Sequence, residues 1–169
     1  METELILSVG GFPPLSARGC EQTLKPIHQK IFKRTFNGDL VSIGAPILKY
    51  ESTISCHDKT AVATEGMCPG IRMDVGCIQR LWQKVDPSSC EKDVLLERKP
   101  VENSISVVDE RGQNMMFSMV SERTIRLPAS DATYFITYRP WLSMRLVDFQ
   151  LTTNEWGMTA GWRLMLEEV

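Results

Sequence analysis

Apolar residues recur at every second position over much of the chain. The clearest case is the C-terminal segment, where Met158, Ala160, Trp162, Leu164 and Leu166 alternate with Thr159, Gly161, Arg163, Met165 and Glu167. Successive side chains of a strand point to opposite faces, so this pattern predicts a strand with one buried face and one exposed or contact face. Residues 134–138 and 142–152 predict two further strands. They are separated at Pro140, which cannot donate to a strand ladder, and residues 153–157 suit a short hairpin loop.

Turn residues predict hairpins elsewhere along the chain. Residues 31–36 and 39–43 flank Asn37-Gly38, a pair suited to the two positive φ angles of a type I′ turn. Residues 107–108 and 115–120 are expected to pair across the polar loop 109–113. Residues 52–56 and 71–85 predict further strands, and the polar segment 57–70 is expected to project as a loop.

Only one segment has the signals of a helix. Ser89 is a possible N-cap, acidic residues follow it, and Pro100 lies just beyond Arg98, so residues 89–98 are the helix candidate. The total of eight to ten short strands predicts an all-β fold. We expect a single β-sandwich or barrel-like domain spanning residues 1–169, with long loops, an extended N-terminal segment and at most one short helix.

Length and charge narrow the class of protein. The chain has 169 residues, 43% of them hydrophobic, with 19 Lys and Arg against 21 Asp and Glu for a net charge of −2. No positive field draws such a chain to nucleic acid or to an anionic membrane. The N-terminal apolar run is too short for a secretory signal, and no stretch approaches the roughly 20 apolar residues of a membrane span. We therefore expect a cytoplasmic site of assembly and reduced cysteines.

Five cysteines are the first candidates for chemistry: Cys20, Cys56, Cys68, Cys77 and Cys90. Zinc sites typically use close pairs of ligands, and no such pair occurs here. Cys56, Cys68, Cys77 and Cys90 remain a minority hypothesis for a zinc or iron–sulfur site. The alternative is plain packing, since Cys77 is in phase with Met73 and Val75 on a predicted strand. We expect no cofactor.

Catalytic motifs are missing from the sequence. His28 and His57 are the two histidines, and no nucleophile elbow, phosphate-binding loop or dinucleotide fingerprint occurs. The basic cluster Lys30, Lys33 and Arg34 lies among aromatic residues, as in some single-strand binders, but three charges on a hairpin are more typical of a solvated face. We expect neither an enzyme nor a nucleic-acid-binding protein.

The chain has more large apolar residues than one buried face of a sheet can hold. Met115, Met116 and Met119 lie close together, and Trp141, Trp156 and Trp162 cluster near the C-terminus. Met and Trp are enriched at protein–protein interfaces. Either a second sheet of the same chain covers these residues, or the protein buries one face against a neighbour.

Several short motifs, in their order along the chain, resemble a known family. They are residues 16–27, 33–41, 49–56 and 66–70, then Tyr138-Arg139-Pro140, Met144, residues 154–157 and residues 162–169. Together they resemble small virion structural proteins of tailed bacteriophages, in the tail and head–tail region. Where those relatives place an aromatic residue before Pro-Gly, this chain has Cys68.

The resemblance implies a non-enzymatic subunit of the tail that forms symmetric rings or tubes. Alternatives are a head-to-tail connector, a capsid decoration protein, or a tail-tip protein with a cysteine-ligated metal or iron–sulfur cluster. The implied partners are copies of the chain and neighbouring virion proteins, with no nucleic acid and no membrane, and the implied location is the virion.

Residues 11–28 form the candidate assembly arm, because this proline-containing segment shows little alternation. Deletion of residues 11–27 is then expected to leave a folded protein that fails to assemble. The candidate interface residues are Arg18, Gln22, Leu24, Met116, Trp141 and Trp156.

Overall fold

The computed structural model describes residues 3–27, 31–43, 49–156 and 160–169. Over these residues the protein is all-β, which confirms the predicted fold class, and no helix occurs among them. The strands are β1 (Ile6–Leu7), β2 (Glu21–Pro26), β3 (Ile31–Arg34), β4 (Leu40–Ile43), β5 (Tyr50–Asp58), β6 (Arg72–Gly76), β7 (Leu81–Val85), β8 (Lys92–Leu95), β9 (Ser106–Asp109), β10 (Ser118–Ser121), β11 (Thr124–Leu127), β12 (Tyr134–Tyr138), β13 (Trp141–Thr153) and β14 (Ala160–Glu168).

Described residues form no helix that is long and apolar enough to cross a membrane.

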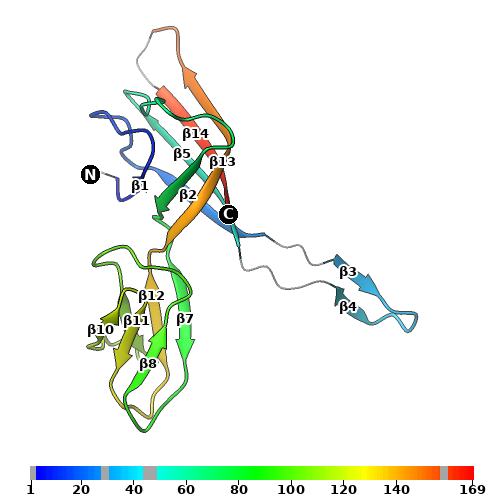
Figure 1. The fold of residues 1–169 in the computed structure, drawn as a ribbon, viewed down its shortest axis with the longest axis vertical. Helices are drawn as coiled ribbons and strands as arrows, with labels where there is room; N and C mark the ends of the chain where they lie inside the picture. The colour runs from blue at the N-terminus through cyan, green and yellow to red at the C-terminus, as the bar shows by residue number, and fades with distance from the viewer. Residues whose placement is uncertain (1–2, 28–30, 44–48, 157–159) are drawn as a thin grey trace.

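A six-stranded antiparallel sheet forms the larger part, which we call the sheet lobe (Figure 1). Its strand order is β1-β6-β13-β14-β5-β2. The alternation predicted for the C-terminus is confirmed in β14, where Trp162, Leu164 and Leu166 are buried while Arg163 and Glu167 are exposed. These side chains pack with Ile54 of β5 and Met144 of β13, both fully buried, to form the core of the lobe.

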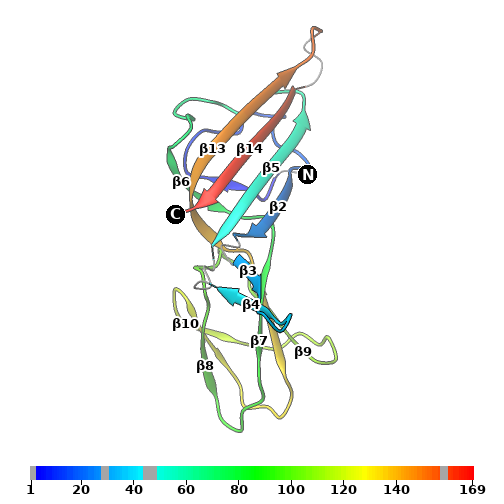
Figure 2. The ribbon, with the colours of Figure 1, turned by 90° about the vertical axis from the view of Figure 1, so that its right-hand side faces the viewer.

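Residues 81–138 form a second, smaller unit, the small lobe, inserted between β6 and β13 (Figure 2). It holds two three-stranded sheets, β7-β12-β9 and β10-β11-β8. Its own hydrophobic cluster includes Ile125, Leu127 and Ile136, each no more than 1% exposed. The chain therefore has two apolar clusters, one in each lobe.

Polar contacts connect the two lobes. Gln22 of β2 accepts backbone N–H bonds from Ile78 and Gln79 through its Oε1, at 2.7 and 3.0 Å. Arg98 of the small lobe pairs with Glu168 of β14 at 2.6 Å. The Arg98–Glu168 pair thus joins the two lobes directly, and Gln22 holds residues 78 and 79, which lead from β6 into the small lobe.

The helix predicted over residues 89–98 is wrong. Lys92–Leu95 is strand β8, which pairs with β11. Val94 and Leu96 are buried whereas Leu95 is 62% exposed, which is the period of two that is typical of a strand. In so short a segment, pairing with a neighbouring strand outweighs the capping signals that favour a helix.

Two hairpin predictions are correct in place but not in detail. The chain turns at residues 109–113 and Met115 donates its N–H to the Val107 carbonyl at 2.9 Å, but β10 then pairs with β11 rather than with β9. The strands between residues 31 and 43 do form a hairpin. Its loop is not type I′, because among Asn37 and Gly38 only Gly38 has a positive φ.

Residues 11–27, the predicted extended arm, pack along the sheet lobe of their own chain. Ala17 is 5% exposed, and the indole N–H of Trp162 donates to the Ser16 carbonyl at 2.7 Å. Glu21–Pro26 pairs along β5 as an edge strand. Residue 28 lies outside the described residues. The loop after β5 also packs inward, since Val62 is 2% exposed and Ala63 forms a bridge with Gly11.

Candidate interaction surfaces

The β3–β4 hairpin stands apart from both lobes (Figure 1). Its loop is closed by two hydrogen bonds, from the Thr35 N–H to the Asp39 carbonyl at 2.8 Å and from the Gly38 N–H to the Thr35 carbonyl at 2.9 Å. Gly38 has a φ of 88°, which a glycine adopts without strain. Arg34 donates to the Gly38 carbonyl at 2.8 Å and stiffens the loop.

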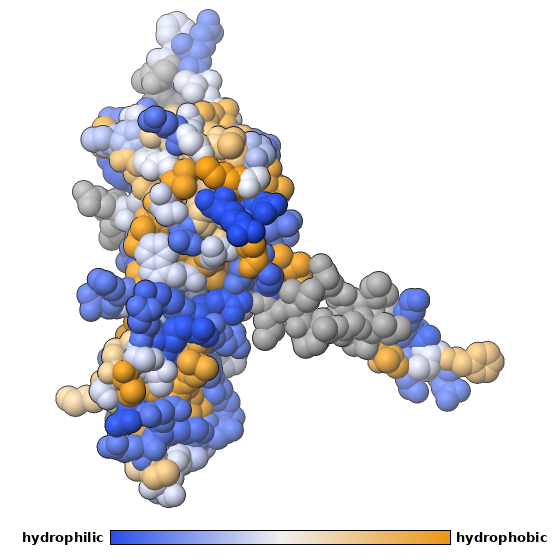
Figure 3. Space-filling view, viewed as in Figure 1, coloured by the Kyte–Doolittle hydropathy of each residue, from blue (hydrophilic) through white to orange (hydrophobic). Residues whose placement is uncertain are grey.

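Large apolar side chains of this hairpin lack cover. Phe36 in the loop is fully exposed at 106%, and Leu40 and Val41 are 60% and 43% exposed. Leu40 faces the same side as Arg34, its direct partner, and Val41 the same side as Lys33. Figure 3 shows hydrophobic residues at the far end of the hairpin. Next to the loop, each face of the hairpin therefore presents one apolar and one basic side chain to solvent.

A second apolar surface, the β10 groove, lies on the small lobe. It is a hollow of about 420 Å³ between the loop at residues 99–105 and the side chains of Phe117, Met119 and Glu122. Met119 pairs directly with Ile125, which in turn pairs with Val94. Ile125 and Val94 are buried, whereas Met119 on the same face is 49% exposed. At the groove, the apolar face that is buried elsewhere in the small lobe is therefore exposed to solvent.

The wall of the β10 groove is held in place by hydrogen bonds. The Ser104 hydroxyl donates to the Val101 carbonyl at 2.6 Å and accepts the Arg139 N–H at 3.2 Å. At the rim, Lys99 pairs with Glu122 at 3.1 Å, and Glu102 is exposed. The groove is thus apolar within, with two carboxylates at its edge.

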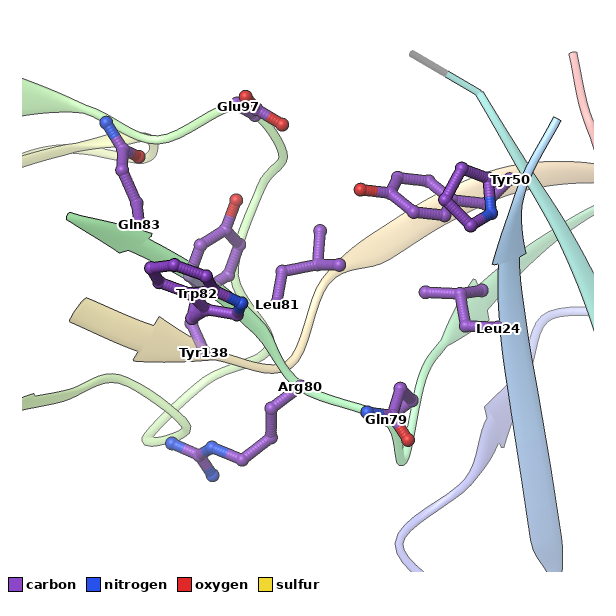
Figure 4. A pocket seen from close by; sticks show the side chains of 10 residues that line it. Leu24, Tyr50, Gln79, Arg80, Leu81, Trp82, Gln83, Glu97 and Tyr138 are labelled. Atoms are coloured by element: carbon purple, nitrogen blue, oxygen red, sulfur yellow. The ribbon is translucent and has the colours of Figure 1, made fainter. Parts of the chain in front are cut away.

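The cleft between the lobes is smaller, about 290 Å³, and is shown in Figure 4. Leu24 and Tyr50 line it from the sheet lobe, and Leu81, Trp82 and Tyr138 from the small lobe. Trp82 is 70% exposed at its edge.

The Arg80 side chain, which lines this cleft, is already engaged in hydrogen bonds. Arg80 points away from the other lining side chains (Figure 4) and donates to the Ser104 and Thr137 carbonyls. Burial raises the pKa of Tyr50 and Tyr138, so both phenols are neutral near pH 7. The buried Oε1 of Gln83 has no hydrogen-bond partner, yet no nucleophile and base meet among the lining residues. The cleft is suited to contact rather than to proton transfer.

The six predicted interface residues are scattered over the molecule. Arg18 pairs with the buried Asp58 at 2.8 Å, and the Gln22 amide is used within the chain. Leu24 lines the cleft, and Trp141 is half-buried. Met116 and Trp156 are open surface residues, 91% and 82% exposed. No single surface contains all six.

The cysteines are not gathered into a site. Cys56 and Cys77 are buried, while Cys68 and Cys90 are exposed. Among the described residues, no three His, Cys, Asp or Glu side chains lie close enough together to hold a metal ion. Burial, reinforced by the nearby Cys20, raises the pKa of Cys56 to about 12, and burial raises that of Cys77 to about 11. Both are therefore protonated thiols at neutral pH.

Two important residues were missed from the sequence. Asp58 is 7% exposed, and its pairing with Arg18 and backbone N–H bonds hold its pKa well below the usual range. Its position in phase with Ile54 and Cys56 is the signal that predicts burial. For Phe36, the signal that predicts exposure is its place in a hairpin loop, because the two strands of a hairpin do not cover a side chain in the loop between them.

Comparison with protein-family models, with curated proteins and with solved structures gives no match.

Proposed function

We propose that this chain is a non-enzymatic structural subunit that assembles with copies of itself through the β3–β4 hairpin. The observation that carries the proposal is Phe36, fully exposed at the tip of a hairpin on which Leu40 and Val41 are exposed as well. A two-stranded hairpin alone in water is marginally stable, so this one gains most from packing against another molecule. Burying a phenylalanine contributes roughly 1.5–3 kcal/mol.

The setting we propose is the virion of a tailed bacteriophage, in the tail. This rests on the resemblance of the short motifs, and the hairpin suits it because a protruding element links neighbouring subunits of a ring or tube. The charges favour protein over nucleic acid as the partner. The described part of the hairpin carries Lys33 and Arg34 against Asp39, and the whole chain has a net charge of −2.

Sedimentation of Phe36→Asp against the unmodified chain tests the proposal. We expect the unmodified chain to sediment as an oligomer and Phe36→Asp as a monomer of 19.2 kDa. Val147→Asp is the matched control, because Val147 is an exposed apolar residue of β13, at 45%, away from the hairpin. An unmodified chain that stays monomeric, or a Phe36→Asp chain that assembles normally, contradicts the proposal.

A further inference from the structure

We infer that the hairpin tip of one copy docks into the β10 groove of a second copy, with Phe36 as the residue that fills it. This inference rests on the proposed function and names the receiving surface. The contact between copies is then head-to-tail, because each chain uses its hairpin tip toward one neighbour and its β10 groove toward the other.

The groove needs an apolar occupant. Its floor continues the core face of Val94 and Ile125, and Met119 leaves that face half uncovered. Phe117 and Ile105 are also only partly buried and pack against the same cluster. An aromatic side chain placed there completes the core of the small lobe, in a hollow of about 420 Å³ whose wall is already fixed.

Charge complementarity selects the hairpin as that occupant. Lys33, Arg34 and Asp39 lie beside the tip, for a net charge of +1. Lys99, Glu102 and Glu122 lie at the groove, for a net charge of −1, and because Lys99 and Glu122 pair with each other, Glu102 is the carboxylate outside that ion pair. Opposite charges at the rim of an apolar contact set its orientation and speed its formation. A tip with an uncovered aromatic residue and a net positive charge therefore matches an apolar hollow whose edge has a net negative charge.

The hairpin of the same chain does not fill the groove. Figure 1 shows the hairpin extending from the junction of the lobes on one side, while β10 lies on the opposite side of the small lobe. The donor must therefore be another copy. Because the two surfaces differ, the contact is heterologous and repeats from copy to copy, giving a ring where the rotation closes.

A mixing experiment tests this arrangement. Phe36→Asp retains an intact groove, and Met119→Asp retains an intact hairpin. We expect each variant alone to be monomeric, and an equal mixture to form a complex of two chains, twice 19.2 kDa, that grows no further because only one intact contact remains. Circular dichroism and thermal melting of Met119→Asp confirm that it is folded, as expected for a residue 49% exposed.

A charge exchange gives a second readout that does not depend on the apolar residues. We expect Glu102→Lys to weaken assembly by about tenfold or more, and its combination with Lys33→Glu to restore it in part. Loss without restoration contradicts the pairing of these charges.

The outcomes separate the two proposals. A monomeric unmodified chain overturns the proposed function and this inference together. If Phe36→Asp is monomeric but Met119→Asp assembles fully, or if the two monomeric variants do not combine, the hairpin acts elsewhere and the groove assignment is overturned. Binding of a single-stranded oligonucleotide that requires Lys33 and Arg34, with no self-assembly, identifies a nucleic-acid arm and overturns both.

Discussion

Gln22 holds with one side chain the segment that leads from the sheet lobe into the small lobe. Its Nε2 donates to the Ser52 hydroxyl at 2.9 Å, and its Oε1 accepts the N–H bonds of Ile78 and Gln79. We expect Gln22→Ala to lower the free energy of unfolding by about 1–3 kcal/mol, because buried Ser52 loses its partner. Urea unfolding measures this. Gln150→Ala is the control, since that exposed amide donates only locally, to Asp148; equal effects in the two variants contradict the role of Gln22.

Asp58 makes stability depend on acid pH. Its hydrogen bond with Arg18 holds the folded-state pKa below the ordinary value of 3.8, so this stabilisation is present above about pH 4 and is lost as the pH falls further. We expect Asp58→Asn to lower the thermal midpoint at pH 7 and to flatten its decline in acid. Asp93→Asn, which removes the half-exposed pair with Arg126, is expected to have a smaller effect. An unchanged acid profile in Asp58→Asn contradicts this account.

Thiol reactivity should follow burial. Exposed Cys68 and Cys90 are expected to react with iodoacetamide in the native protein at pH 8, whereas buried Cys56 and Cys77, with raised pKa values, react only after unfolding. Peptide mass spectrometry after timed labelling measures this. Rapid native labelling of Cys56 or Cys77 contradicts their placement in the core.

At the scale of elements, the pattern of apolar residues along the chain predicted three of the strands correctly. The strands β12, β13 and β14 lie where the pattern of apolar residues placed them. The helix predicted over residues 89–98 failed because capping signals are local, whereas β8 exists through its pairing with β11. The place of residues 11–27 also depends on distant contacts, such as that of Ser16 with Trp162, which the local sequence does not encode.

Two changes of whole elements are expected to have opposite effects. Replacing residues 31–43 by a Gly-Ser linker removes none of the described residues of either apolar cluster, so we expect the free energy of unfolding to change by less than about 1 kcal/mol. Deleting residues 11–27 removes Ala17 and β2 from the sheet lobe, so we expect cooperative unfolding to be lost.

Thermal melts followed by circular dichroism measure both changes. A folded protein after the deletion returns residues 11–27 to the role of an arm, and an unfolded protein after the linker replacement makes the hairpin part of the core.

At the scale of the whole molecule, the described residues form two apolar clusters, which explain how the lobes are stable. The Phe36 tip and the β10 groove are two apolar surfaces that these clusters leave uncovered, and other large side chains, among them Trp82 and Trp156, are exposed as well. The surplus of methionine near residue 116 indicated an interface from the sequence, and Met119 does lie at the groove. The groove itself could not be predicted, because its walls come from segments that only the fold brings together.

The native mass of the purified full chain is the most direct test of assembly. We predict species at integer multiples of 19.2 kDa, in one closed stoichiometry, and a return to 19.2 kDa when residues 31–43 are replaced by the Gly-Ser linker. A chain that remains at 19.2 kDa at every concentration tested, or an oligomer that survives the loss of the hairpin, contradicts the account.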